Sequence, residues 1–164
     1  MQSNHITRRA AFTLVELAVV VTIIAILAAI AIPHFRKTKD SALISTFEHD
    51  IRLFEQELDS FELIKHRYPP TQNVAGAFPV GMENRMSVAW KNPPPIGGTY
   101  RWVYTTEDDP KDRSGYIEVV GTLANPILID AARLIEIDED LDDGNPSTGH
   151  LRQHGLNIQY YVKH

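Results

Sequence analysis

The feature that most constrains this chain is an apolar run near its N-terminus. From Phe12 to Ile32 there are 21 residues, and Glu16 is the only charged residue among them. As an α-helix this run would be roughly 30 Å long, which matches the hydrocarbon core of a bilayer. The sequence therefore predicts a membrane-spanning helix over residues 12–33. Because a carboxylate at lipid depth is costly, Glu16 is expected to have a functional role and a partner.

A polar, basic leader precedes the run. It covers residues 1–11 and contains Arg8 and Arg9 but no acidic residue. A secretory signal peptide would have a cleavage site of small residues after its apolar part, and residues 28–31 (AAIA) offer one. A plain signal anchor is a second interpretation. Neither interpretation explains a glutamate inside the apolar run.

A basic leader followed by FTLVE at residues 12–16 resembles the cleavage and methylation motif of type IV prepilins and of the pseudopilins of type II secretion. The resemblance implies that prepilin peptidase cuts between Ala11 and Phe12 and that the new Phe12 amine is N-methylated. It also implies that the Glu16 carboxylate pairs with the Phe12 amine of a neighbouring subunit during assembly. A charge-assisted contact of this kind offsets the cost of a carboxylate in lipid. The family prefers Gly before the cut, where this chain has Ala11.

The apolar pattern becomes amphipathic after Pro33, where the resemblance implies a helix kink. Apolar residues then recur at steps of three and four, at Leu43, Phe47, Ile51, Phe54, Leu58 and Phe61. This spacing predicts that residues 34–66 are the amphipathic second half of one long helix that begins at about Thr13. Pro69 and Pro70 follow, and proline disfavours helix at itself and at the residue before it.

Residues 67–164 are predicted to form a globular head. A loop rich in Pro and Gly over 69–98 is expected to run along the surface, with a short helical turn at 84–90. Strands are predicted at 99–105 and 115–120, joined as a hairpin by a polar turn, and at 157–162, with an edge piece near 150–152. A helix is predicted to start at Asn125-Pro126. Its apolar face is predicted to carry Ile127, Ala131, Leu134, Ile135, Asp138 and Leu141. The predicted fold class is α+β and pilin-like, a long N-terminal helix packed on a small antiparallel sheet.

An acidic stretch follows the predicted second helix. Asp138, Asp140 and Asp142 alternate as in a calcium loop, but an EF-hand would have Gly at position 143 and Glu at position 149, where this chain has Asp and Gly. Pseudopilins similar to the major subunit often hold calcium near this part of the fold, although this chain lacks their loop pattern. Two interpretations stay open. One is a solvated helix end and turn, and the other is a calcium ion held by Asp140, Asp142, Asp143 and Asn145.

Composition argues against several function classes. The chain has no cysteine, so it has neither disulfides nor thiolate metal sites. Its formal net charge is -5, and removal of the leader with its two arginines makes it -7, which disfavours a nucleic-acid partner. Nucleophile-elbow, phosphate-loop and zinc-ligand spacings are also absent from the sequence, so we expect no enzymatic activity.

The resemblance implies a structural subunit of a type II secretion pseudopilus, closest in outline to the major pseudopilin. Its implied partners are prepilin peptidase, copies of itself or other pseudopilins, an inner-membrane assembly platform and membrane lipid. The implied location is the bacterial inner membrane, crossed once, with the C-terminal domain in the periplasm until assembly into a filament. Two alternatives remain, namely a type IV pilin for adhesion, motility or DNA uptake, and a membrane-anchored binding domain that never polymerises.

Overall fold

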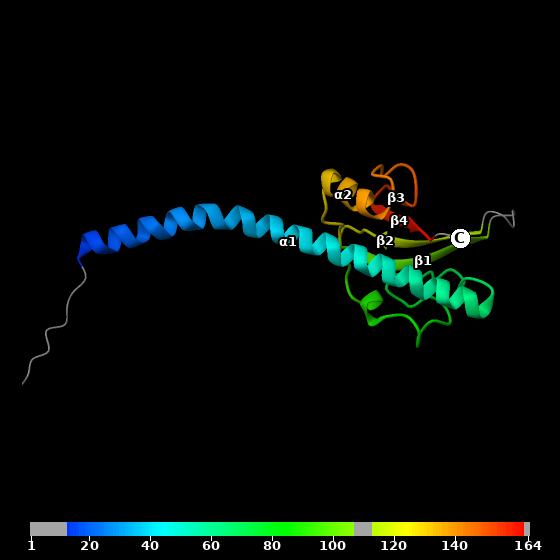
Figure 1. The fold of residues 1–164 in the computed structure, drawn as a ribbon. Coiled ribbons are helices and arrows are strands. Elements are labelled where there is room, and N and C mark those ends of the chain that lie inside the picture. The colour runs from blue at the N-terminus through cyan, green and yellow to red at the C-terminus, as the bar shows by residue number, and fades with distance from the viewer. Residues whose placement is uncertain (1–12, 107–112, 163–164) are drawn as a thin grey trace, which may run out of the picture. The chain divides into compact units, whose positions relative to one another are not determined.

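The computed structural model describes residues 13–106 and 113–162. The elements in chain order are α1 (Leu14–Lys65), the 3-10 helix η1 (Val88–Lys91), β1 (Thr99–Thr106), β2 (Arg113–Val120), α2 (Ala131–Leu141), β3 (Leu151–His154) and β4 (Asn157–Tyr161) (Figure 1). The chain divides into two compact units, Met1–Asp40 and Ser41–His164, and the second is called the head below. A long N-terminal helix and a small antiparallel sheet confirm the predicted α+β fold.

The first unit contains the apolar part of α1. This is the one helix, among the described residues, that is long and apolar enough to cross a membrane, and none of its most apolar window is buried within the protein. Pro33 lies inside α1. A proline inside a helix lacks the amide donor for one backbone hydrogen bond, which favours a bend. The helix kink expected at Pro33 stays a prediction.

The head is built on the C-terminal half of α1, which buries one stripe of side chains. The stripe consists of Ile44, Phe47, Ile51, Phe54, Leu58 and Phe61, none more than 6% exposed. The prediction that Leu43 starts the stripe is wrong, because its side chain is 38% exposed. Steps of three and four alternate along the buried residues, and a step of three back from Phe47 reaches Ile44.

The stripe covers one face of a four-stranded antiparallel sheet with the order β1-β2-β4-β3. The predicted hairpin is confirmed, with Trp102 of β1 opposite Ile117 of β2. The predicted C-terminal strand and its edge piece are β4 and β3. The buried apolar residues of the three long strands stand at every second position, in keeping with a sheet that packs one face on the helix. These buried residues are Tyr100, Trp102, Ile117, Val119, Ile158 and Tyr160.

The long loop between α1 and β1 contributes to the core, so its interpretation as a surface connection is wrong. Met82, Trp90 and Ile96 are all buried, and the helical turn falls at Val88–Lys91. The Trp90 Nε1 donates to the Ala77 carbonyl at 2.8 Å, and the Trp102 Nε1 donates to the Pro69 carbonyl at 2.8 Å. These two hydrogen bonds satisfy the indole donors, which allows both rings to be fully buried.

Helix α2 begins later than the sequence predicts. The Leu128 amide donates to the Ile96 carbonyl at 2.7 Å and Ile127 forms a bridge with Gly97, so the backbone here pairs with a distant segment instead of coiling. The helix starts after Asp130, whose Oδ1 accepts from the Arg133 amide at 2.9 Å and caps the first turn. The buried face carries Leu134, Ile137, Asp138 and Leu141, whereas Ala131 and Ile135, which were expected on it, are exposed.

Candidate functional site

The first turn of α1 fixes the Glu16 side chain. The amide and the hydroxyl of Thr13 each donate to Glu16 Oε2 at 2.8 Å, and the Glu16 amide donates to Thr13 Oγ1 at 3.2 Å. This reciprocal arrangement is a capping box, which satisfies amide donors that a helix N-terminus otherwise leaves unpaired. The spacing Thr-x-x-Glu could have revealed it from the sequence. Within one chain, therefore, the Glu16 carboxylate is already held by its own helix.

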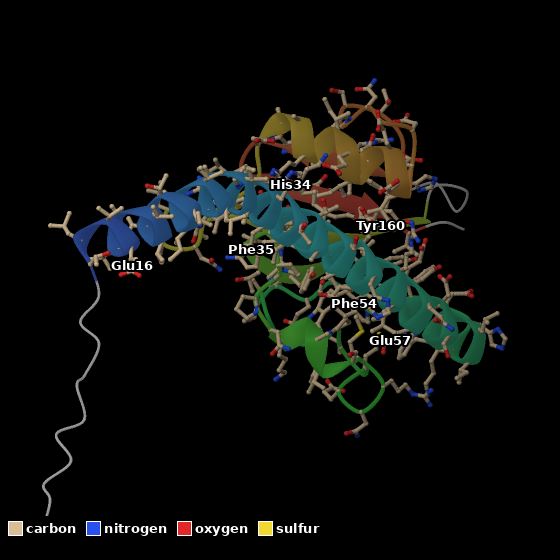
Figure 2. The ribbon with its side chains drawn as sticks, turned by 60° about the vertical axis from the view of Figure 1, so that its left-hand side comes forward. Glu16, His34, Phe35, Phe54, Glu57 and Tyr160 are labelled. Carbon is tan, nitrogen blue, oxygen red and sulfur yellow. The ribbon has the colours of Figure 1, made fainter. Side chains whose placement is uncertain are left out.

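The predicted processing site lies next to this turn. Ala11 and Phe12 are outside the described residues, so cleavage between them, methylation of the Phe12 amine and its pairing with Glu16 stay predictions. Figure 2 shows Glu16 near the N-terminal end of α1, whereas Phe54 and Glu57 lie on its C-terminal half. The head core and the predicted assembly residue thus belong to opposite ends of one helix.

The surface of α1 is apolar on all sides between Leu17 and Ile32. Large apolar side chains that are mostly exposed follow Glu16 along the helix, among them Leu17, Ile24, Leu27 and Ile30. A helix that is hydrophobic all round needs lipid or other helices around it. This geometry suits a segment that lies first in a bilayer and then among similar helices.

A second candidate site lies where α2 ends. One carboxylate oxygen from each of Asp138, Asp142 and Asp143 lies within 4.8 Å of the others. Burial, and then the neighbouring carboxylates, raise the pKa of Asp138 to about 6. Hydrogen bonds from the Asn145 amide and the Thr148 hydroxyl lower the pKa of the exposed Asp143.

Two of the four calcium ligands predicted from the sequence, Asp142 and Asp143, lie in this cluster. Asp140 is exposed on α2, and its backbone carbonyl accepts from Arg52 Nη2 of α1 at 2.8 Å. The Asn145 amide donates to Asp143 Oδ1 at 2.9 Å. Asp138 was missing from the predicted set, although its place on an apolar helix face was a signal, since a carboxylate seldom lies there without a partner.

Comparison with known proteins shows to which class of proteins the N-terminal segment is similar. Residues 6–32 match the family model described as the prokaryotic N-terminal methylation motif. The chain thus has a prepilin-type N-terminal segment, which leads into a long helix whose second half packs on an antiparallel sheet. This confirms the resemblance inferred from the basic leader and the FTLVE sequence.

More particular similarity is to core protein G of type II secretion systems. The chain is 33% identical to that of Pseudomonas aeruginosa over 88 residues, which is 54% of this chain and 57% of the relative. It is 36% identical to that of Dickeya chrysanthemi over 70 residues, 43% of this chain and 46% of the relative. For Aeromonas hydrophila the identity is 37% over 65 residues, 40% of this chain and 46% of the relative. The chain therefore spans about half the length of the curated relatives that it matches. No solved structure matches it.

Proposed function

We propose that this chain is a structural subunit of a type II secretion pseudopilus, anchored by its N-terminal helix and polymerised through it. The observation that carries the proposal is the methylation-motif match over residues 6–32, which leads into an exposed apolar helix with Glu16 as its charged residue. Similarity to core protein G of type II secretion supports this choice among filament proteins.

The capping box gives Glu16 a role both before and during assembly. In a single subunit, the two Thr13 donors hold the carboxylate through Oε2. A carboxylate oxygen has more than one acceptor site, so the side chain can take a further donor without losing Thr13. In the proposed mechanism that donor is the methylated Phe12 amine of the next subunit. The added charge-assisted contact favours the packed helix over the solitary one in lipid.

The other partners follow from this assignment. Prepilin peptidase would remove residues 1–11, and the inner-membrane assembly platform would move the processed subunit into a filament of copies of itself or of other pseudopilins. The head would lie in the periplasm and form the outer layer of the filament. Its role would be packing rather than catalysis. A type IV pilin is the nearest alternative, and an anchored binding domain that never polymerises is the next.

The test is incorporation of Glu16→Ala into filaments in the native host, with Thr22→Ala as matched control. Thr22 lies in the same apolar segment, and its hydroxyl donates only within the helix, to the Ala18 carbonyl at 2.8 Å. We expect both variants to be inserted and to begin at Phe12 by intact mass. Thr22→Ala should enter sheared filaments and Glu16→Ala should not. If Glu16→Ala enters filaments at the wild-type level, the proposed role of Glu16 in assembly is wrong.

The N-terminal residue, the effect of gene deletion and filament incorporation together separate the alternatives. A wild-type protein that still begins at Met1, or that begins beyond Ala31, would overturn the prepilin-type assignment altogether. Deletion of the gene should abolish secretion of folded proteins if the filament is a pseudopilus. Loss of surface pili, adhesion or DNA uptake with intact secretion would instead favour a type IV pilin. A correctly processed protein that never enters filaments would favour the anchored binding domain.

A further inference from the structure

Three basic residues follow the apolar part of α1 directly. They are Arg36, Lys37 and Lys39, called the basic collar below, and their side chains are all exposed. They belong to the first compact unit of the chain, not to the head. The sequence has no acidic residue between Glu16 and Asp40. The collar is therefore the first concentrated charge on the helix after the apolar run.

The collar is spread around the helix instead of following one face. Counted around the axis from Arg36, Lys39 lies about 60° to one side, because an α-helix has 3.6 residues per turn. Lys37 lies about 100° to the other side, and His34, also on α1 (Figure 2), about 160° to that side. A protein that docks on one side of a helix meets a single stripe of residues three and four apart. The wide spread of the bases instead suits a layer that surrounds the helix.

The depth of the collar matches the headgroup layer of a bilayer. The apolar run ends at Ile32, and Arg36 follows about 6 Å further along the helix axis, at 1.5 Å per residue. The headgroup layer extends roughly 5–8 Å beyond the hydrocarbon core on each side. Because the Cα–Cβ bonds of a helix tilt toward its N-terminus, long side chains in the collar lean back toward the lipid. Lys39, about 10 Å beyond Ile32, therefore reaches the same layer with its four-carbon side chain.

Insertion into the membrane does not account for the collar. Basic residues near the end of a membrane helix favour the cytoplasmic side of that end. The leader carries two, Arg8 and Arg9, and the proposed cleavage removes both. In the proposed orientation the three bases of the collar lie on the opposite, periplasmic side, where they act against this rule. A partner with negative charge on that side would offset the unfavourable placement.

We propose that the basic collar binds phospholipid headgroups of net negative charge in the periplasmic leaflet, so that the subunit selects anionic lipid around its helix. The inference rests on the proposed anchoring of α1 in the inner membrane, but not on the role of Glu16 or on polymerisation. Arginine and lysine both donate charge-assisted hydrogen bonds to phosphate oxygens. Each base close to an anionic membrane surface contributes roughly a fivefold preference, so three contribute up to roughly a hundredfold at low salt.

The experiment is lipid titration of the protein extracted in detergent from its native host, followed by native mass spectrometry. The probes are phosphatidylglycerol, which is anionic, and phosphatidylethanolamine, which is zwitterionic. We expect wild type to bind phosphatidylglycerol at least tenfold more tightly in dilute ammonium acetate. The preference should shrink at tenfold higher salt, because salt screens exposed charges. A variant with Arg36→Gln, Lys37→Gln and Lys39→Gln should lose at least fivefold of the preference.

The matched control removes three bases from the head. Lys65, Arg67 and Arg85 are exposed, so their joint replacement by glutamine makes the same change of net charge away from the collar. This control should keep the wild-type preference within about twofold. Both triple variants should keep the wild-type urea midpoint of the head, measured by tryptophan fluorescence, because the replaced side chains lie outside the core.

A second variant keeps the charge of the collar and changes its side chains. Arg36→Lys, Lys37→Arg and Lys39→Arg together should retain the preference for phosphatidylglycerol within about threefold, because the attraction depends on positive charge at this depth. A loss as large as that of the glutamine variant would show that the shape of these side chains matters and that their charge does not carry the binding.

Three further results would overturn the proposal. They are a wild-type protein without preference for phosphatidylglycerol, a glutamine variant of the collar with the wild-type preference, and a head control that loses as much preference as the collar variant. If the collar variant keeps the lipid preference but no longer enters filaments, the collar contacts an acidic protein surface instead. The same spectra give the N-terminal residue, so failed processing is distinguished from failed lipid binding.

Discussion

Replacement of Phe54 by alanine tests the packing of the head core most directly. The Phe54 ring is fully buried on α1 and meets two aromatic rings edge-on. These are Trp90, at 5.0 Å between centroids and 75°, and Tyr100, at 4.9 Å and 80°. One substitution on the helix therefore removes contacts to the loop and to the sheet at once.

The size of the effect follows from these contacts. Burial of a phenylalanine side chain contributes about 2–3 kcal/mol, and each of the two edge-on ring contacts adds roughly 0.5–1.5 kcal/mol. The sum, about 4 kcal/mol, lies within the range of about 3–5 kcal/mol for phenylalanine-to-alanine changes in cores. At a urea dependence of about 1.5–2 kcal/mol per molar, the unfolding midpoint should fall by about 2 M.

The assay is urea unfolding of the full-length protein in detergent, followed by tryptophan fluorescence. Both tryptophans, Trp90 and Trp102, are fully buried in the head, so the signal reports the head alone. Leu63→Ala is the control, because Leu63 lies on the same helix and is 73% exposed, and it should change the free energy of unfolding by less than about 0.5 kcal/mol. If Phe54→Ala costs less than about 1 kcal/mol, or no more than Leu63→Ala, the described core packing is wrong.

Two further predictions use the same unfolding assay. Gly115→Ala places a Cβ 2.2 Å from Cη2 of the buried Trp102, so it should destabilise the head by about 1–3 kcal/mol, and a neutral result would show that the ring can move. Glu48→Gln tests pH dependence, since burial, followed by the Asp140 charge, raises the pKa of Glu48 above 4.5. The folded state then binds this proton more tightly than the unfolded state does, so wild type loses stability as pH rises from about 4.5 through the folded pKa. Glu48→Gln should therefore be more stable than wild type at pH 7 and should lose that advantage at pH 4, whereas an equal advantage at both values would contradict the reasoning.

Local patterns in the sequence were enough to predict the long helix and the hairpin. The apolar run and the three-and-four spacing that follows it predicted α1 almost to its ends, because both patterns lie within one helix. The β-branched and aromatic residues around Trp102 and Ile117 predicted β1 and β2 in the same way. The basic leader and the FTLVE motif were sufficient for the prepilin-type assignment, since a short contiguous sequence carries it.

The remaining features depended on contacts between residues far apart in the chain. The first turn predicted for α2 is instead paired with the backbone of Ile96 and Gly97. Trp90 of the loop joins the core, where its ring packs against Phe54 and Tyr100. Asp138 became a candidate ligand only when the fold buried it beside Asp142 and Asp143. Periodicity shows which face of a helix is apolar, but the element that covers that face, and the partner that a buried charge finds there, are decided by tertiary packing.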